Sequence, residues 1–435
     1  MLNRAWGFVL VLAAIGCNDS VGEHGLNAGS GEFAVGSDNY SGATSISLLD
    51  DEANVSQDDW LSSKVKNPKL RTPLSDDVVF PTSSADASIL TTVERSLGVI
   101  TRFDLATGNV LGQLRTDDSP EDDEAAFHSN PQDVLFVSEE SAWVSRWESN
   151  PNSDAEARER GNDLIEWNPK TWKRTDRRID LSELDQQLEE PTFDMEGNST
   201  DSVEATAYAS PNALVPVGGS FAAVGITGIT KSYSYAEGRL AIVDLERGRL
   251  VSTLKLEGLS NCGELKPVPS EPQSVIVACI GAFGDEGAQA GLLKVTVDTA
   301  GKAKIQHAFR KAEHDDAANT NSNVASLGGN IVVAVAAGRI DSKTMKPAEV
   351  DKLYRVDLAS GEQEELWESD GAFVLGMPAF AASTGLLLVP DAGNSDQPLT
   401  GVQRFRVNAE SEVEHDDFVD VAAETGLAAR RVLAL

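Results

Sequence analysis

The sequence predicts an all-β fold, a β-propeller with six blades and with seven as the alternative. From about residue 76 onward, apolar residues alternate with polar ones, which is typical of half-buried strands. One hairpin unit also recurs at intervals of roughly 50 to 75 residues, with further apolar runs between its copies. Four short strands per repeat of that size are typical of propeller blades. A β-sandwich or two smaller β domains are the alternatives to a propeller.

The recurring unit is a strand, a turn and a second strand. Its first strand ends in an Asp or Asn, whose side chain can accept N–H bonds from the turn. In the clear copies a following Gly supplies the positive φ that closes the hairpin. The clear copies are VITRFDLATG (99–108), RLAIVDLERG (239–248), LLKVTVDTAG (292–301) and KLYRVDLASG (352–361), and the weaker ones are DLIEWNPKTW (163–172) and GVQRFRVNAE (401–410). The six turn residues are Asp104, Asn168, Asp244, Asp298, Asp357 and Asn408.

Six copies favour six blades, and a seventh would have to lie within residues 40–95, where no clear hairpin is found. The C-terminal segment GLAARRVLAL (426–435) is strand-like and is expected to complete the first blade, because closing the ring removes exposed strand edges. One helix is predicted over LSELDQQLEEP (181–191), where the leucines share a face, Ser182 and Asp185 form a capping box and Pro191 ends the helix. It is expected to be an insertion between the second and third hairpin units.

The hairpin pattern, preceded by runs such as GLLLVPDAGN (385–394), resembles the blades of YVTN-type and quinoprotein-like propellers, which are WD40-like in fold. The likeness covers most of residues 76–435, although the literal Y-V-T-N string is absent. It implies a fold and hardly an activity, because one fold hosts many functions. Quinone-dependent dehydrogenases of this fold often carry vicinal cysteines and repeated tryptophan motifs, and the sequence contains neither.

The first 17 residues predict export and lipid attachment. An apolar run over 5–15 follows Arg4 and is about 11 residues long, which is too short for a membrane span and fits a secretory signal. It ends in AIGC (14–17), which resembles the lipobox of bacterial lipoproteins. The resemblance implies cleavage before Cys17, with diacylglycerol on its sulfur and a fatty acid on its new amino group. An ordinary signal peptide is the alternative.

The predicted organisation is a signal peptide over 1–16, a flexible acidic tether over 17–75 and a β-propeller over 76–435. Gly, Ser, Asn and Asp dominate the tether, and no apolar periodicity lasts there. Several acyl chains hold a protein stably at a membrane. The chain is therefore expected at the cell envelope, anchored by lipid to the outer membrane or the periplasmic face.

The charge balance limits the partners. The chain has 69 acidic and 36 basic residues, a formal net charge of −33. Such a surface repels phosphate backbones, so nucleic acid is excluded as the natural partner. A solvated, solubilising surface is the simpler interpretation, and a role in collecting cations is the alternative.

The three cysteines behave as one plus a pair. Cys262 and Cys279 lie in NCGELKPVPSEPQSVIVACI (261–280), with turn residues PSEP midway. A hairpin turn centred on Ser270 and Glu271 places the two cysteines opposite each other, within reach of a disulfide. An exported compartment permits that bond. Two buried free thiols are the alternative.

Turns that lead into the innermost strands of a propeller face its central funnel, where such folds usually hold ligands. Several of these turns repeat polar residues, and Asn is also a common turn residue, so a purely structural role is the alternative. The candidate funnel-lining residues are His128, Asn130, Asn212, Asn261 and Asn323.

The sequence carries no motif that assigns a reaction. It has no nucleophile elbow, zinc-protease helix, P-loop or dinucleotide fingerprint, and it predicts no cofactor, no catalytic residue and no metal ligand. The acidic strings at 117–128, 313–316 and 414–417 lack the alternation of a calcium loop. We therefore expect a binding or scaffold module for an envelope protein or a small ligand. A hydrolase, lyase or dehydrogenase is the alternative, and His128 and His314 beside carboxylates in the funnel would favour it.

Overall fold

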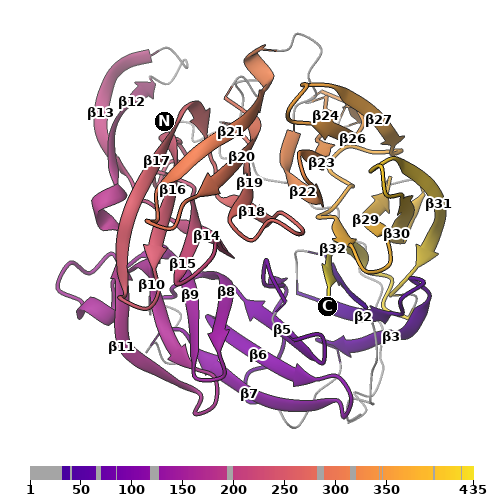
Figure 1. Ribbon diagram of the computed structural model, residues 1–435, viewed down its shortest axis with the longest axis horizontal. Helices are drawn as coiled ribbons and strands as arrows, with labels where there is room; N and C mark the ends of the chain where they lie inside the picture. Colours follow the sequence, from indigo (N-terminus) through magenta and orange to yellow (C-terminus); the bar gives the residue numbers. More distant parts are fainter. Residues whose placement is uncertain are drawn as a thin grey trace.

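In a computed structural model, seven four-stranded antiparallel sheets surround a central axis, and the chain is an all-β propeller (Figure 1). The structure describes residues 32–39, 42–64, 70–84, 86–117, 127–193, 199–281, 289–313, 320–341, 343–344, 346–394, 397–422 and 424–435. Within these ranges the helical pieces are three single 3₁₀ turns, at Ala157–Glu159, Ser182–Leu184 and Lys311–Glu313. None of the described residues forms a helix long and apolar enough to cross a membrane.

The blades are numbered along the chain, and each is given from its innermost to its outermost strand. Blade 1 is β32 (Ala428–Ala434), β1 (Phe33–Asp38), β2 (Thr44–Leu49) and β3 (Val55–Ser62). Blade 2 is β4 (Val78–Val79), β5 (Ile89–Glu94), β6 (Val99–Asp104) and β7 (Asn109–Arg115). Blade 3 is β8 (Pro131–Ser138), β9 (Ser141–Ser149), β10 (Gly161–Asn168) and β11 (Lys173–Asp180). Blade 4 is β14 (Pro211–Pro216), β15 (Phe221–Ile226), β16 (Glu237–Asp244) and β17 (Arg249–Ser260).

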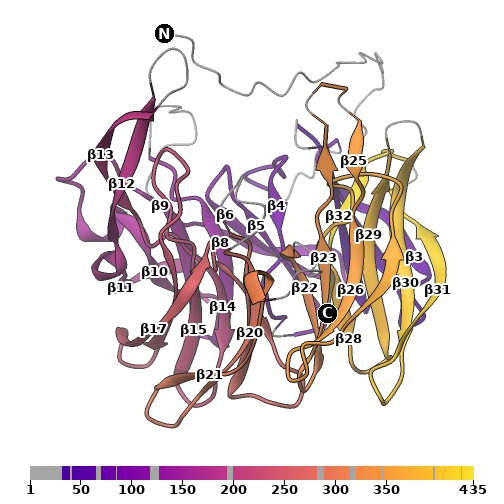
Figure 2. The same cartoon turned by 90° about the horizontal axis from the view of Figure 1, so that it is seen from above.

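The remaining blades follow the same order. Blade 5 is β18 (Glu264–Pro267), β19 (Ser274–Cys279), β20 (Gly291–Val297) and β21 (Ala303–Arg310). Blade 6 is β22 (Thr320–Gly328), β23 (Ile331–Ala336), β26 (Lys352–Asp357) and β27 (Gln363–Glu368). Blade 7 is β28 (Ala379–Ala381), β29 (Leu386–Gly393), β30 (Pro398–Val407) and β31 (Val413–Asp420). Two accessory hairpins, β12 (Gln186–Phe193) with β13 (Ser199–Ala207) and β24 (Arg339–Ile340) with β25 (Pro347–Glu349), rise from one face of the ring (Figure 2).

The preference for six blades is wrong, and the seventh hairpin unit lies at residues 44–62. Its turn residue is Asp50, whose Oδ1 accepts the backbone N–H groups of Glu52 and Asn54 at 3.0 and 2.8 Å. The residue with positive φ is Ala53, at 60°, three residues after Asp50, as Gly301 is three residues after Asp298. The sequence pattern did not reveal this unit because the glycine that marks the turn in the clear copies is absent, although the turn itself forms. The predicted tether over 17–75 is accordingly wrong for Phe33–Asp38, Thr44–Leu49 and Val55–Ser62, which are strands of blade 1.

The C-terminal strand closes the ring, as the sequence predicted. β32 is the innermost strand of blade 1 and pairs antiparallel with β1, from Phe33 opposite Ala434 to Asp38 opposite Ala428. The Leu435 N–H donates to the Glu32 carbonyl at 2.8 Å, so the C-terminus and the first described residue lie side by side. This pairing gives blade 1 its full set of four strands and leaves β1 with no open edge.

The predicted helix over 181–191 is wrong. After one 3₁₀ turn at Ser182–Leu184, the chain extends into β12 and pairs with β13. Asp185, expected in a capping box, instead accepts the Ala209 N–H and the Asn162 side-chain amide, at 2.8 and 2.9 Å. These tertiary bonds and the pairing with β13 outweigh the helical period of the leucines. The segment is an insertion, as predicted, but it is a β-hairpin, and it lies between blades 3 and 4 rather than blades 2 and 3 because the prediction left out blade 1.

One buried carboxyl makes the stability of the propeller depend on pH. Glu94 is 1% exposed and accepts hydrogen bonds from the Ser75 N–H and hydroxyl, at 2.7 and 2.9 Å. Burial raises the pKa of Glu94 from 4.5 to about 8, against the effect of the Ser75 bonds. The folded state therefore holds a proton that the unfolded state releases. Its contribution is complete below about pH 4.5 and is lost as the pH rises towards 8.

We therefore expect Glu94→Gln, which stays neutral, to weaken the pH dependence of folding. The free energy of unfolding of the unmodified protein should fall between pH 5 and 8, by up to about 1.4 kcal/mol per pH unit from this group. The variant should lose that component and be the more stable of the two at pH 8. Urea denaturation at pH 5, 6.5 and 8 measures both slopes, and parallel slopes would contradict the assignment.

Candidate functional site

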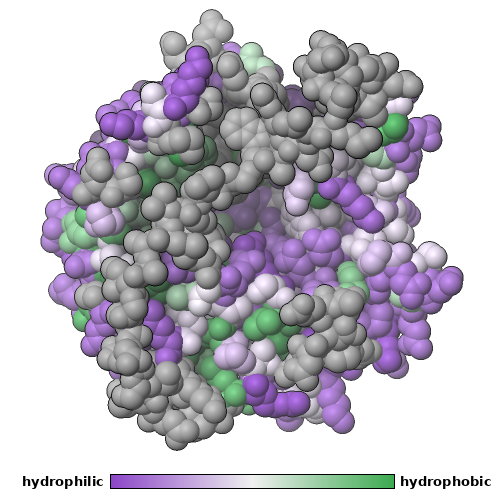
Figure 3. Space-filling model, turned by 180° about the vertical axis from the view of Figure 1, so that it is seen from behind, coloured by the Kyte–Doolittle hydropathy of each residue, from purple (hydrophilic) through white to green (hydrophobic). Residues whose placement is uncertain are grey.

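A cavity of about 1070 Å³ lies along the axis of the propeller, and its lining includes residues where the innermost strands begin and residues where they end. We call it the funnel. The accessory hairpins rise from the face where the innermost strands begin, and Figure 3 shows hydrophilic side chains around the middle of that face. All seven innermost strands or the turns that lead into them contribute to the wall. The funnel is therefore the place where side chains from every blade converge, as ligand sites of this kind require.

Four of the five candidate residues line the funnel. Asn130 and Asn212 stand at the start of blades 3 and 4, and Asn261 and Asn323 at the start of blades 5 and 6. Asn130 and Asn261 both take a left-handed backbone, with φ of 49° and 54°, which Asn tolerates better than most residues. His128 does not lie in the described wall of the funnel. His314, the second histidine of the enzyme alternative, lies outside the described residues.

The wall at blades 2 and 3 carries a continuous chain of hydrogen bonds. The Arg95 guanidinium donates from Nε to Asp77 at 2.8 Å and from Nη1 to the Gln132 side-chain oxygen at 3.2 Å. The Gln132 amide in turn donates to Asn130 Oδ1 at 2.6 Å. Each of these side chains is hydrogen-bonded to another residue of the protein. This half of the wall is held in one arrangement before any ligand arrives.

The wall at blade 5 carries an ion pair. Lys266 Nζ lies 2.8 Å from Glu264 Oε1, and the two side chains are 14% and 10% exposed. The same ammonium reaches Met377 Sδ at 3.4 Å, in the segment that leads into blade 7. Lys266 therefore connects blade 5 to the segment that leads into blade 7. A thioether is a weak acceptor, so the carboxylate is the main partner of this ammonium.

Asp133, a buried residue of the funnel wall, joins three blades. Its carboxylate accepts the N–H groups of Thr82, Val134 and Leu214 at 2.9, 2.7 and 2.7 Å. Burial raises the pKa of Asp133 to about 6, and the hydrogen bond from Thr82 opposes that rise. Because all these partners are donors from the backbone, Asp133 holds blades 2, 3 and 4 in register. It is a structural carboxylate, and its raised pKa does not mark an acid–base catalyst.

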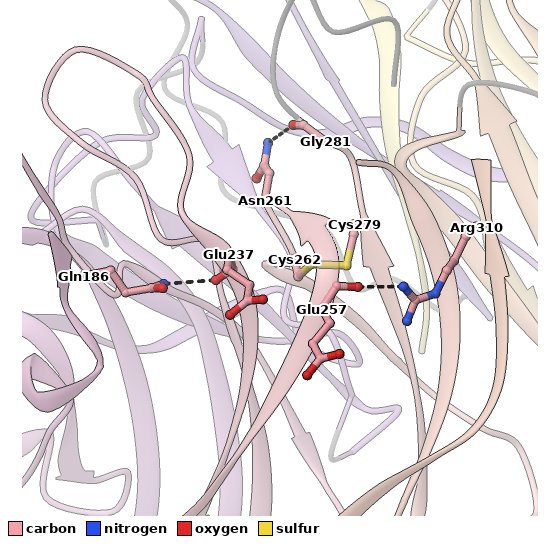
Figure 4. The surroundings of a disulfide bond; sticks show 8 residues. All are labelled: Gln186, Glu237, Glu257, Asn261, Cys262, Cys279, Gly281 and Arg310. Carbon is pink, nitrogen blue, oxygen red and sulfur yellow. Dashed lines mark hydrogen bonds between the residues drawn. A yellow bond between two sulfur atoms is a disulfide. The ribbon is translucent and has the colours of Figure 1, made fainter. Parts of the chain in front are cut away.

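The predicted disulfide between Cys262 and Cys279 is confirmed (Figure 4). It joins the turn before β18 to the end of β19, and both residues are buried. The strands pair with Glu264 opposite Ala278, and one extra residue, Gly263, brings Cys262 opposite Cys279. Asn261, Gly263 and Ile280, which flank the two cysteines, line the funnel. The bond thus fixes one sector of the wall.

Removal of this bond should weaken the fold by about 3 kcal/mol, the usual value for a loop near this length. The variant to use is Cys262→Ala with Cys279→Ala, because a single substitution would leave a free thiol. Its urea midpoint should fall, and the dependence of the free energy of unfolding on urea concentration should rise slightly, because the unfolded chain without the cross-link is less compact. Equal midpoints with and without reductant in the unsubstituted protein would contradict the prediction.

Sequence reasoning missed several wall residues, although a signal existed for one of them. The segments SNPQD (129–133) and ASPNA (209–213) share one pattern. Each has a residue with positive φ, then a proline that begins the innermost strand, then a residue with a side-chain amide. That alignment makes Gln132 the counterpart of Asn212. Arg95 comes from the turn between β5 and β6, and Glu264 and Lys266 come from β18. None of them belongs to a repeated pattern, so only the assembled ring brings them together. The described residues contain no cluster of three metal-ligating side chains.

No protein-family model and no curated protein matches the sequence. A hypothetical selenium-binding protein from Sulfolobus tokodaii is similar in structure, with 9% identity and a TM-score of 0.53 over 94% of this chain and 97% of that chain. The chain has a WD40-like propeller fold. The Cps50 (Swd1) β-propeller domain of Myceliophteria thermophila is 14% identical, with a TM-score of 0.48 over 85% of this chain and 93% of that chain.

A third solved structure is the periplasmic gluconolactonase PpgL of Pseudomonas aeruginosa, which is 13% identical, with a TM-score of 0.47 over 92% of this chain and 98% of that chain. At these identities the likeness concerns the fold alone. Any function has to be argued from the funnel and its side chains.

Proposed function

We propose that the chain is an exported lipoprotein whose propeller binds a small uncharged, hydrogen-bonding ligand in the funnel. The observation that carries this proposal is the charge of the wall. Within the described residues, four basic side chains (Arg95, Lys266, Arg430 and Arg431) and five acidic ones (Asp77, Asp86, Asp133, Glu148 and Glu264) line the funnel. The near balance contrasts with a chain of net charge −33. The surface repels anions, and the paired charges of the wall offer little to a cation.

Exposed aromatic side chains at the funnel support a binding role. Tyr233 and Phe373 line it and are 74% and 60% exposed, which is unusual for large apolar groups on a soluble surface. Phe373 is held by Asp351, whose carboxylate accepts the N–H groups of Phe373, Val374 and Leu375 at 2.7, 2.6 and 2.8 Å. Exposed aromatic side chains beside amides are typical of binding sites.

Ligand binding is tested with the full chain carrying Cys17→Ala, which gives a lipid-free protein. We expect neutral oligosaccharides or uncharged peptides to raise the unfolding temperature, and the double variant Tyr233→Ala with Phe373→Ala to lose that rise. A rise with spermidine or a polyanion, and none with a neutral compound, would overturn the proposal.

The anchor needs a separate experiment. In detergent phase separation the unsubstituted protein should enter the detergent phase, and Cys17→Ala should stay in the aqueous phase. A Cys17→Ala protein that still follows the detergent would overturn the lipid attachment.

A further inference from the structure

We infer that the ligand is a neutral saccharide and that it binds the funnel wall formed by blades 4 and 5. The inference rests on the proposed binding function and adds the class of ligand and the half of the funnel that holds it. We call this half the blade 4–5 wall; it consists of Asn212, Thr227, Asn261, Glu264 and Lys266, all of which line the funnel.

The hydrogen-bonding capacity of the two halves differs. At blades 2 and 3, the chain from Asp77 through Arg95 and Gln132 occupies the oxygen of Asn130, and the Asn130 side-chain N–H has one long contact, 3.5 Å to Glu148 Oε1. A ligand would have to break those bonds before making its own. Replacing an existing hydrogen bond yields little net affinity, so this half offers a ligand shape more than hydrogen bonds.

The blade 4–5 wall has the opposite character. Among the described residues, the Asn212 side-chain amide makes no hydrogen bond, and the Asn261 amide has one long contact, 3.5 Å to the Gly281 carbonyl (Figure 4). The hydroxyl of Thr227, a residue only 2% exposed, has no partner among them either. Buried polar groups without partners are costly, and a ligand that supplies the partners recovers that cost.

The backbone places these groups side by side. Gly263 lies so close to them that a Cβ on it would stand 2.5 Å from Thr227 Oγ1 and 2.9 Å from Asn212 Nδ2. The Asn212 carbonyl accepts the Ser145 hydroxyl at 2.6 Å, which fixes the backbone of the neighbouring strand. Glycine at 263 therefore brings the hydroxyl and the amide together from blade 4 against the backbone of blade 5.

The ion pair adds a donor and an acceptor next to each other. Lys266 Nζ and Glu264 Oε1 are 2.8 Å apart, Glu264 Oε2 makes no hydrogen bond to a described residue, and the ammonium has a third proton to donate. Two neighbouring hydroxyls can bridge such a pair, one donating to the carboxylate and the other accepting from the ammonium. Charge-assisted hydrogen bonds of this kind are stronger than neutral ones.

A neutral saccharide fits this combination best. Each hydroxyl both donates and accepts, which matches amides, a hydroxyl and an ion pair that present both functions. The C–H face of a sugar ring is flat and apolar, and the Tyr233 ring, 74% exposed in the loop between β15 and β16, offers it a surface on the same side of the funnel. An uncharged peptide shares the amide chemistry but lacks neighbouring hydroxyls for the ion pair.

The test uses the full Cys17→Ala chain and isothermal titration with maltotriose, cellotriose, chitotriose and the tripeptide Gly-Gly-Gly amide-capped at both ends. Asn261→Gly and Asn130→Gly are a matched pair, because both remove an amide from a left-handed position that Gly adopts without strain. At least one trisaccharide should bind, and Asn261→Gly should weaken it at least fivefold more than Asn130→Gly does.

Thr227→Val gives a second readout that a structural role would not produce. It removes an unpartnered hydroxyl while keeping the shape, so the ligand-free protein should unfold at the same or a higher temperature. The trisaccharide should nevertheless bind about tenfold more weakly. A lower unfolding temperature with unchanged affinity would overturn the assignment of Thr227.

The possible outcomes distinguish the inference of a saccharide at the blade 4–5 wall from the proposed ligand-binding function on which it rests. Binding of the tripeptide with no trisaccharide binding overturns the saccharide and leaves a ligand-binding funnel. A trisaccharide that Asn130→Gly weakens as much as Asn261→Gly does overturns the blade 4–5 wall. Binding of neither class overturns both the inference and the proposed function.

Discussion

A chain that ends before Gly426 is expected not to fold into a propeller. The strand removed, β32, is the innermost of blade 1, and its Ala429, Val432 and Leu433 are buried in the core on both sides of that blade. Arg431 also donates to Asp38 and to the Val78 carbonyl, each at 3.0 Å, and so joins blade 1 to blade 2. Without β32 the ring has a gap, and β1 presents an open edge.

The size of the effect follows from the apolar surface that β32 buries. Burying one Val or Leu side chain stabilises a fold by about 1.5–3 kcal/mol, and a domain is stable by only about 5–15 kcal/mol in total. The removal of several such residues, with the hydrogen bonds along β1, uses up most of that margin. Circular dichroism of the truncated chain should show no cooperative thermal transition, and a transition near that of the full chain would contradict the prediction.

A circular permutant provides the matched control. Because Leu435 and Glu32 lie side by side, a short loop can join them. New ends can be opened in the exposed turn after Asn408, between β30 and β31. This permutant keeps every strand and makes blade 1 continuous, so it should fold with a thermal transition close to that of the natural order. Failure of the permutant as well would show that chain order, rather than the missing strand, controls folding.

Local chemistry made most of the fold predictable from sequence. At all six recognised units the side chain of the turn residue accepts backbone N–H groups, for example Asp298 from Ala300 and Lys302, both at 2.9 Å. Such turns depend on two or three neighbouring residues, so a short pattern reveals them. Blade 1 was not predicted because its turn has Ala53, with φ of 60°, and because its innermost strand comes from the other end of the chain.

The helix error and the missed wall residues have a common physical origin. In residues 181–191 the local period favoured a helix, but pairing with β13 and the bonds of Asp185 decided the outcome. In the same way, Arg95 acquires its role from Gln132, a residue of the next blade. The Asn residues could be predicted because turns concentrate them near the funnel, whereas charged strand residues reach it only through the geometry of the ring.

The second large effect is expected at Arg146, a fully buried arginine. Its Nε and Nη2 donate to the two carboxylate oxygens of Asp163, both at 2.8 Å, and Arg178 also pairs with that carboxylate. The remaining donors reach two carbonyls: Nη1 lies 3.0 Å from the Thr116 oxygen of the preceding blade, and Nη2 lies 2.6 Å from the Arg158 oxygen. The guanidinium therefore connects three segments of the chain, at Thr116, Arg158 and Asp163.

We expect Arg146→Met to destabilise the propeller by about 3–5 kcal/mol, the usual result of removing one member of a buried ion pair. The apolar replacement fills the volume but leaves Asp163 with one cation in place of two, and it takes a donor away from each of two carbonyls. Urea denaturation measures the loss. Lys170→Met is the control, because Lys170 pairs with Glu140 on the surface and should change stability by less than about 1 kcal/mol.

A double-mutant cycle with Asp163→Leu separates the ion pair from the other bonds of Arg146. If the pair dominates, the double variant should be much more stable than the sum of the two single losses predicts. If the carbonyl contacts dominate, the losses should add, because those bonds do not involve Asp163.

Arg146 is followed directly by Trp147 and Glu148 of the funnel wall. Loosening it should therefore weaken ligand binding as well as the fold, and binding that stays intact at a reduced unfolding temperature would contradict that coupling.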